Sequence, residues 1–249
     1  MNKENFFNLL KIVLIPLHKE GIRFVLIFAF VTILLALMSG TLGLIGLVLT
    51  AWCAFFFRDP QRFTPEAKDL IISPADGVVN SVETGVSAPL ELNLSKNKKW
   101  NKISIFLNVF NVHVNRIPVA GKITQLNYQT GEFLSANLAE ASFKNERQLA
   151  VVQTPDNQEV IFAQIAGLVA RRIICDLKEG QQVKAGERYG IIRFGSRMDI
   201  YLPQEAKIKT LIGQTMIGGE TVIAKLAAEK KAKVVKKSST SEASKKVKK

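Results

Sequence analysis

The pair Gly195-Ser196, within the segment RYGIIRFGSRMDIYLP (residues 188–203), combines a nucleophile with a flexible backbone position. Alternation along a strand places Ser196 on the same face as Met198 and Ile200, which predicts a serine facing the core. Gly195 beside it indicates a bulge or a bend in that strand. A serine hydroxyl is a weak nucleophile that needs a neighbouring base, so the pair alone is equally typical of a small residue at a bulge.

Two further residues could supply that base and orient it. The chain has only two histidines, and the first precedes a long apolar run, so His113 in NVHVNR is the imidazole available to the region that follows. A lone histidine on a strand is more often structural than catalytic. Asp76 lies in SPADGVV, where Pro-x-Asp-Gly is ordinary turn chemistry. The spacing of these residues leaves both interpretations open.

Composition excludes several classes of protein. A chain of 249 residues with 47% hydrophobic content can build a substantial core. Cys53 and Cys175 are the only cysteines, which fits a reducing compartment without a disulfide. With one histidine in the folded region, the sequence offers no cluster of ligands for a zinc site.

Residues 24–57 form an uncharged run of 34 residues, FVLIFAFVTILLALMSGTLGLIGLVLTAWCAFFF. A single helix of this length would be roughly 50 Å long, well beyond the ~30 Å hydrocarbon core of a bilayer. The segment MSGTLG at 38–43 predicts a break, so the run is expected to form a helical hairpin that spans the membrane twice or dips into one leaflet. Basic residues flank both outer ends, which predicts that the rest of the chain lies on the cytoplasmic side of the cell membrane.

The net charge of +13 is concentrated at the C-terminal end, where residues 229–249 hold nine Lys and two Glu. This segment is rich in Lys and Ser and lacks aromatic residues, so it predicts a disordered basic tail. Attraction to an anionic membrane is the function we favour for it, with no nucleic acid expected as a partner.

Short β-runs separated by glycine turns fill the region between the hairpin and the tail. Examples are KISIFLNV, QLAVVQT, EVIFAQIAG and MDIYLP. This pattern predicts a mainly β protein, a compact barrel or sandwich of interlocked hairpins, with one short helix at 134–146. The expected organisation is therefore an N-terminal segment 1–63 with the membrane hairpin, a folded β domain 64–228 and the tail 229–249.

Seven ordered blocks give the chain a close resemblance to the short, membrane-anchored form of the phosphatidylserine decarboxylase proenzymes, over roughly residues 19–226. The blocks are FFFRDPQR, SPADGVV, ISIFLNVFNVHVNRIPVAGKI, NERQLAVV, QIAGLVARRI, EGQQVKAGERYGIIRFGSRMDIYLP and GETVIAKL.

The resemblance implies an enzyme that processes itself. In such proenzymes the serine hydroxyl attacks the preceding glycine carbonyl, and the serine ends as a pyruvoyl cofactor. Gly195 and Ser196 match that pair, and Asp76 and His113 match the partners of a catalytic triad with Ser196. The products would be a β subunit of residues 1–195 and an α subunit of residues 196–249, an α/β heterodimer that could assemble into a higher homo-oligomer. Processing would need only these four residues, so we expect it to survive removal of residues 1–57.

The resemblance further implies decarboxylation of phosphatidylserine to phosphatidylethanolamine and carbon dioxide, without a metal or pyridoxal phosphate. Arg116, Arg171, Arg172 and Arg197 are candidate ligands for the phosphate of the head group. Longer bacterial members carry two histidines three residues apart, whereas this chain has His113 and Arg116. Because a guanidinium stays protonated at neutral pH, Arg116 cannot replace a histidine as a base.

Other classes of protein remain as alternatives. A pyruvoyl decarboxylase for another amino-acid head group would use the same Gly-Ser chemistry, and a non-catalytic membrane-attached β scaffold would use none of it. A biotinyl or lipoyl carrier would need a lysine at a hairpin tip, and the chain has no Met-Lys-Met or Asp-Lys-Ala. A zinc peptidase would need several histidine and aspartate ligands.

Overall fold

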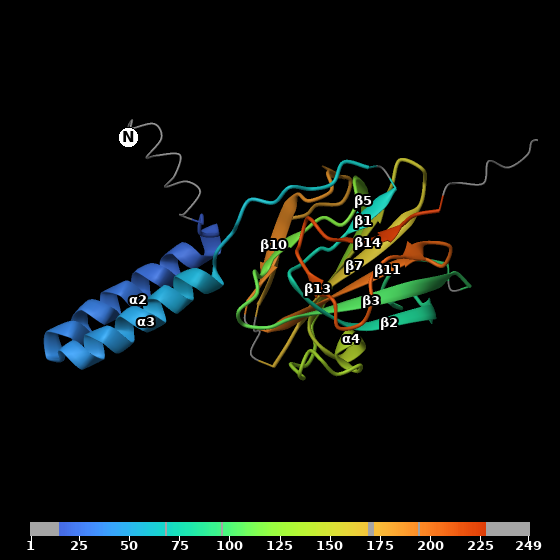
Figure 1. Ribbon diagram of the computed structural model, residues 1–249. Coiled ribbons are helices and arrows are strands. Elements are labelled where there is room, and N and C mark those ends of the chain that lie inside the picture. The colour runs from blue at the N-terminus through green and yellow to red at the C-terminus, as the bar shows by residue number, and fades with distance from the viewer. Residues whose placement is uncertain (1–14, 68, 96, 169–171, 194, 228–249) are drawn as a thin grey trace, which may run out of the picture.

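The computed structural model of the 249-residue chain describes residues 15–67, 69–95, 97–168, 172–193 and 195–227. A pair of apolar helices projects from one side of a mainly β domain (Figure 1). The predicted fold class is therefore confirmed. The basic tail predicted at 229–249 lies outside the described residues.

The N-terminal elements are two antiparallel helices, α2 (Lys19–Met38) and α3 (Gly40–Phe56). Ser39 between them has an extended backbone with φ −161°, so the break expected at 38–43 is present. By length and composition α2 could cross a membrane, and α3 is a shorter apolar helix. Most of their large apolar side chains are exposed, which in a soluble protein would be an aggregation hazard and which suits contact with lipid.

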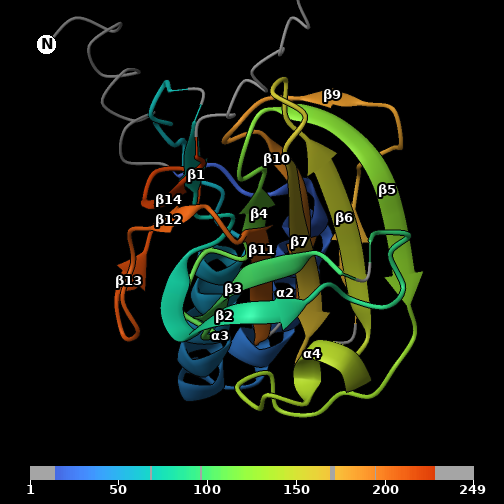
Figure 2. The ribbon, with the colours of Figure 1, turned by 90° about the vertical axis from the view of Figure 1, so that its right-hand side faces the viewer.

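Eight antiparallel strands form a curved sheet in the order β13–β2–β3–β11–β7–β6–β5–β9 (Figure 2). Their bounds in that order are Thr215–Met216, Gly77–Ser87, Lys99–Leu107, Ser196–Pro203, Glu159–Ala166, Arg147–Gln153, Gly121–Gln129 and Gln182–Val183. The curvature encloses the main hydrophobic core, because the inward side chains of the central strands β3, β7 and β11 converge there.

Two small antiparallel sheets complete the domain. One contains β4 (Val114–Arg116), β10 (Arg188–Ile192) and β8 (Ile173–Cys175), and the other contains β1 (Leu70–Ile72), β14 (Val222–Lys225) and β12 (Lys207–Ile208).

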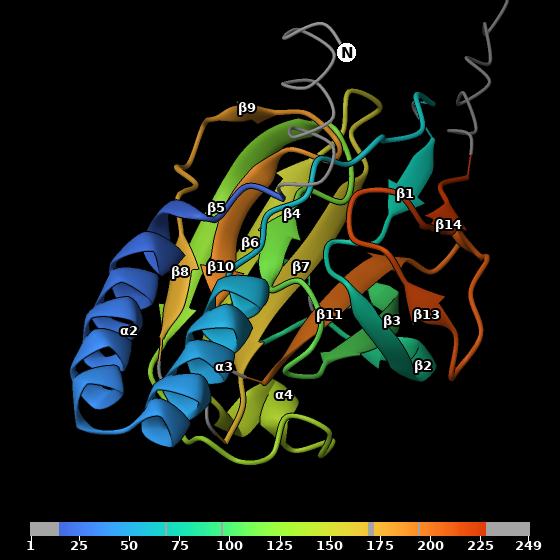
Figure 3. The same ribbon diagram turned by 60° about the vertical axis from the view of Figure 1, so that its left-hand side comes forward.

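The β4–β10–β8 sheet lies between the helix pair and the main core (Figure 3). On one face Val114 and Ile191 pack against Phe56 at the end of α3. On the other face Tyr189 meets Phe162 of β7 edge to face, with ring centroids 5.2 Å apart. The helix pair therefore packs directly on a strand layer of the β domain.

Strand β11 is buried along its whole length. Met198 and Ile200 point into the main core, as alternation predicts. Tyr201 on the opposite face joins a second apolar cluster around Trp100, so this strand has no solvent-facing side.

The helix expected at 134–146 is much shorter than predicted, since α4 spans only Ala141–Lys144. The carbonyl oxygens of Ala136 and Leu138 accept hydrogen bonds from the Arg197 guanidinium at 2.9 and 2.7 Å. The residues before α4 form turns, in which the Leu138 amide donates to the Ser135 carbonyl at 3.0 Å.

Candidate active site

Ser196 begins β11 and lies between the ends of two neighbouring strands. It pairs with Leu107 of β3 on one side and with Ala166 of β7 on the other. The residue is completely buried, and its hydroxyl oxygen has no hydrogen-bond partner among the described residues. An unsatisfied buried hydroxyl is costly, so it calls for an explanation beyond packing.

Gly195 has φ +62°, in the left-handed region that glycine enters without strain. Its carbonyl oxygen faces the backbone of Gly167, just beyond β7. A β-carbon placed on Gly167 would lie 2.3 Å from that oxygen. Gly195 is therefore required for its own left-handed backbone conformation. Gly167 is required because the Gly195 carbonyl oxygen leaves no space for a β-carbon there.

His113 lies just before β4, at the same end of the β3–β11 pair as Ser196. Its carbonyl oxygen accepts a hydrogen bond from the Ile192 amide at 3.4 Å, which ties it to the last residue of β10. Its ring is fully buried, with its centroid 4.3 Å from that of Phe56. The terminal turn of α3 therefore forms one wall of the histidine pocket.

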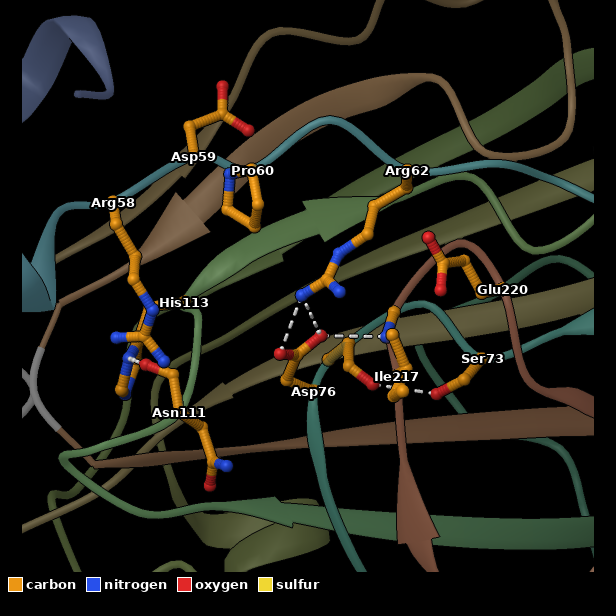
Figure 4. Close-up of polar contacts among 12 residues, drawn as sticks. Arg58, Asp59, Pro60, Arg62, Ser73, Asp76, Asn111, His113, Ile217 and Glu220 are labelled. Atoms are coloured by element: carbon orange, nitrogen blue, oxygen red, sulfur yellow. Dashed lines mark hydrogen bonds and ion pairs between the residues drawn. The ribbon is translucent and has the colours of Figure 1, made fainter. Parts of the chain in front are cut away.

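The tautomer of His113 follows from its hydrogen bond. Nδ1 lies 3.0 Å from the carbonyl oxygen of Asn111, which can only accept, so Nδ1 carries the proton and donates it (Figure 4). Nε2 is then an unprotonated lone pair, and it is buried without a partner among the described residues. This is the arrangement that a general base requires.

Burial lowers the pKa of His113 to about 4, because the charged imidazolium would lose its hydration. The hydrogen bond to Asn111 opposes this shift, and the positive charge of Arg58 adds to it. His113 is therefore neutral at pH 7.

The described hydrogen-bond partners of Asp76 do not include the His113 ring that the predicted triad requires. Its carboxylate accepts two hydrogen bonds from Arg62, at 2.8 and 3.1 Å, and one from the Gly218 amide at 2.7 Å (Figure 4). Burial raises its pKa, against the opposing effects of the Gly218 amide and the nearby arginines. Among the described residues no hydrogen bond joins Asp76 to His113, so the structure gathers these residues in one region without linking them as a triad.

Arg62 belongs to residues 58–62, RDPQR, which we call the strap. The strap leads from α3 across the domain. Arg58 at its start donates to the Phe110 carbonyl at 2.7 Å, near His113. Arg116 donates to the carbonyls of Pro60 and Gly186, at 2.8 and 3.0 Å. The strap lies in the first block that carries the family resemblance, but nothing in the sequence indicated that its arginines lie beside Asp76 and His113.

The four arginines proposed for phosphate binding differ in their surroundings. Arg116 is 4% exposed and holds the strap, and burial lowers its pKa to about 10, which leaves it charged at neutral pH. Arg197 is 2% exposed and forms an ion pair with Asp199 at 2.8 Å. Arg172 is exposed, and Arg171 lies outside the described residues. Since the guanidinium groups of Arg116 and Arg197 are occupied by the protein itself, neither is carried forward as a phosphate ligand.

Comparison with known proteins supports an assignment. A family model for phosphatidylserine decarboxylase matches residues 49–224. The phosphatidylserine decarboxylase proenzyme of Rickettsia felis is 52% identical over 216 residues, which cover 87% of this chain and 93% of that protein. The proenzyme of Rickettsia bellii is 52% identical over 218 residues, covering 88% and 94%. The chain belongs to the phosphatidylserine decarboxylase family.

The family match extends from α3 to β14 and so includes the end of the helix pair as well as the β domain. The Ser196 hydroxyl and His113 Nε2 are two of ten buried side-chain atoms without a hydrogen-bond partner among the described residues. Among the described residues no group of three or more His, Cys, Asp or Glu side chains could hold a metal ion.

We expect His113 to titrate near pH 4, and Phe56→Ala to raise its pKa toward the ordinary 6.5 by admitting water. As the pH falls below 6.5, His113 binds a proton in the unfolded chain at a higher pH than in the folded chain. His113 therefore lowers folding stability progressively as the pH falls from 6.5 to about 4 and has no such effect above pH 6.5. NMR titration of histidine-labelled protein, with His18→Gln for assignment, measures both values. A wild-type pKa of 6.5 would contradict the buried pocket.

Proposed function

We propose that the chain is a self-processing, pyruvoyl-dependent decarboxylase that converts phosphatidylserine to phosphatidylethanolamine and carbon dioxide at a membrane surface. The observation that carries this proposal is the buried Ser196 hydroxyl without a partner, directly after a glycine in a left-handed conformation. Family membership supports the reaction and the substrate.

Processing begins at the Gly195–Ser196 peptide. The Ser196 hydroxyl oxygen bonds to the Gly195 carbonyl carbon, the C–N bond breaks, and the hydroxyl proton passes to the Ser196 nitrogen, which leaves an ester. Loss of the Ser196 α-proton then breaks the bond from Cβ to the ester oxygen and releases a chain of residues 1–195 with a free carboxylate. The remaining dehydroalanine takes up water and loses ammonia, so that residue 196 becomes a pyruvoyl group.

His113 is the proposed base for these proton transfers. It is neutral at pH 7, its Nε2 lone pair has no competing partner in the described chain, and Asn111 fixes its tautomer. We keep Asp76 in the site in a supporting role, because its carboxylate anchors Arg62 of the strap. In a catalytic triad a carboxylate orients the imidazole. In this chain the Asn111 backbone carbonyl orients the His113 ring.

The surroundings of residue 196 fit a pyruvoyl group. The position is completely buried, and its neighbours on β3 and β7 are the apolar residues Leu107 and Ala166, which would exclude water from the reacting atoms. When formed, the pyruvoyl carbonyl supplies an electron sink for the electron pair released as carbon dioxide leaves. The chain would hold this group through its strand pairing on both sides.

The helix pair supports phosphatidylserine as substrate over a soluble amino acid. Phe56, the last residue of α3, touches His113, so the candidate base lies where the apolar helices meet the domain. A head group whose acyl chains stay in a bilayer could reach such a site. The flanking basic residues favour the cytoplasmic side of the membrane. Arg171 and Arg172 are the proposed ligands of the head-group phosphate.

Substrate and processing can be tested together. Wild-type protein should separate into chains of residues 1–195 and 196–249 and release carbon dioxide from phosphatidylserine in vesicles, whereas Ser196→Ala should stay in one piece and release none. Intact mass spectrometry and carboxyl-labelled substrate give the two readouts. Release from free serine at a similar rate would favour a decarboxylase for another head group, and an uncut, inactive wild type would favour a non-catalytic scaffold.

The contact between Gly167 and the Gly195 carbonyl gives a second test. Gly167→Ala should slow processing by on the order of 10²-fold, because the new methyl group must displace the carbonyl under attack. Gly40→Ala is the matched control, since no atom lies within 4 Å of its added β-carbon. Pulse-chase gels measure the rate, and thermal melting checks that the fold is retained. Processing of Gly167→Ala at the wild-type rate would show that this carbonyl is not held in the reactive position.

A further inference from the structure

We infer that the base of the helix pair is part of the processing site, because Glu20 of α2 holds Arg193, three residues before Ser196. This inference rests on the proposed self-processing reaction and adds two positioning residues to it. Neither residue was singled out by the chemistry of the sequence.

The contact is specific and partly buried. Nη2 of Arg193 donates to the Glu20 carboxylate in an ion pair, with the two side chains 11% and 30% exposed. The Arg193 guanidinium also lies over the ring of Phe24, one turn further along α2, with its carbon 5.1 Å from the ring centroid. Arg193 is thus held by charge and by an aromatic face, both from the same helix.

Arg193 occupies the position where the chain leaves one sheet for another. β10, which ends at Ile192, belongs to the small sheet, and β11, which begins at Ser196, belongs to the eight-stranded sheet. The scissile peptide lies at the end of this crossing. Strand pairing fixes its Ser196 side, whereas on the Arg193 side the described contacts are one long backbone hydrogen bond to the Arg172 carbonyl, at 3.3 Å, and the side-chain anchor on α2.

The start of α2 is firmly joined to the end of α3, which in turn packs on Val114 and Ile191 of the β domain. A β-carbon on Gly21 would lie 2.2 Å from the side chain of Phe57, and Phe24 stacks on Phe57 with centroids 5.5 Å apart. Backbone hydrogen bonds add to this packing: the His18 amide donates to the Phe57 carbonyl at 2.8 Å and the Asp59 amide to the Pro16 carbonyl at 2.7 Å. Movement of α2 would therefore move Arg193.

The same helix pair covers the proposed base, because Phe56 packs on His113. The scissile peptide and the proposed base thus both depend on the helix pair. Arg193 links the scissile peptide to α2, and Phe56 of α3 covers the His113 imidazole. These contacts lead us to revise the expectation that processing survives removal of residues 1–57. Maturation should require a docked helix pair.

The test uses full-length protein and the rate of processing. Glu20→Gln and Arg193→Gln should each slow processing about tenfold or more, the scale expected when a reacting group is displaced by a fraction of an ångström. The exchanged pair, Glu20→Arg with Arg193→Glu, should recover part of the rate, because it restores the ion pair but not the contact of a guanidinium with the Phe24 ring. Once processed, the single variants should keep wild-type kcat and KM on dispersed substrate.

The chain provides a matched control. Lys19 and Asp176 form a second ion pair at the same joint, at 2.7 Å, but both side chains are more than half exposed. Asp176→Asn breaks this pair without touching Arg193 and should process at the wild-type rate.

Each outcome has a distinct meaning. Wild-type processing rates in Glu20→Gln and Arg193→Gln would overturn the inference and leave the proposed function intact. If Asp176→Asn and the exchanged pair slowed processing as much as Glu20→Gln and Arg193→Gln, the inference would also be overturned. A general weakening of the contact between helices and domain would then explain the slower processing. A wild-type chain that never divides would instead reject the proposed function, and the inference with it.

Discussion

The packing of the end of α3 against the β4–β10–β8 sheet is the interaction on which the site depends. Phe56 closes over His113 and, with Phe57, packs against Val114 and Ile191, so the imidazole is completely removed from water. That burial keeps His113 uncharged at neutral pH and leaves its Nε2 available. Without the helix pair, the same histidine would be hydrated and its pKa would return toward 6.5.

The two proposed reactants are both buried polar groups without a hydrogen-bond partner among the described residues. A native structure normally satisfies its buried hydroxyl and ring nitrogen atoms, because each unsatisfied group costs about 1–3 kcal/mol. Here the Ser196 hydroxyl and His113 Nε2 both remain unsatisfied in the described chain. Both lie at one end of the β3–β11 pair, beside the attachment of helices suited to a membrane. The fold thus places the peptide that we propose to be cleaved beside the attachment of the apolar helices.

The features predicted from sequence are those that depend on neighbouring residues. Alternation and glycine chemistry identified the core-facing Ser196 and the bend at Gly195, and the uncharged run identified the helix pair and its break at Ser39. Hydrogen-bond partners that lie far apart in the sequence could not be predicted. Arg62 of the strap, and not His113, binds Asp76, and the Arg197 guanidinium donates to the carbonyls of Ala136 and Leu138. The Asp199 two residues beyond Arg197, on a strand that is mostly apolar, was the available signal that this arginine is buried in an ion pair.

The most direct test of the account is labelling of the mature protein with a carbonyl-reactive hydrazide probe, followed by separation of the two chains. The account predicts label on the 196–249 chain alone, none in Ser196→Ala, and protection by vesicles containing phosphatidylserine but not by vesicles of phosphatidylcholine. Absence of label from that chain would contradict a cofactor formed at residue 196. Equal protection by both kinds of vesicle would contradict a site that recognises the serine head group.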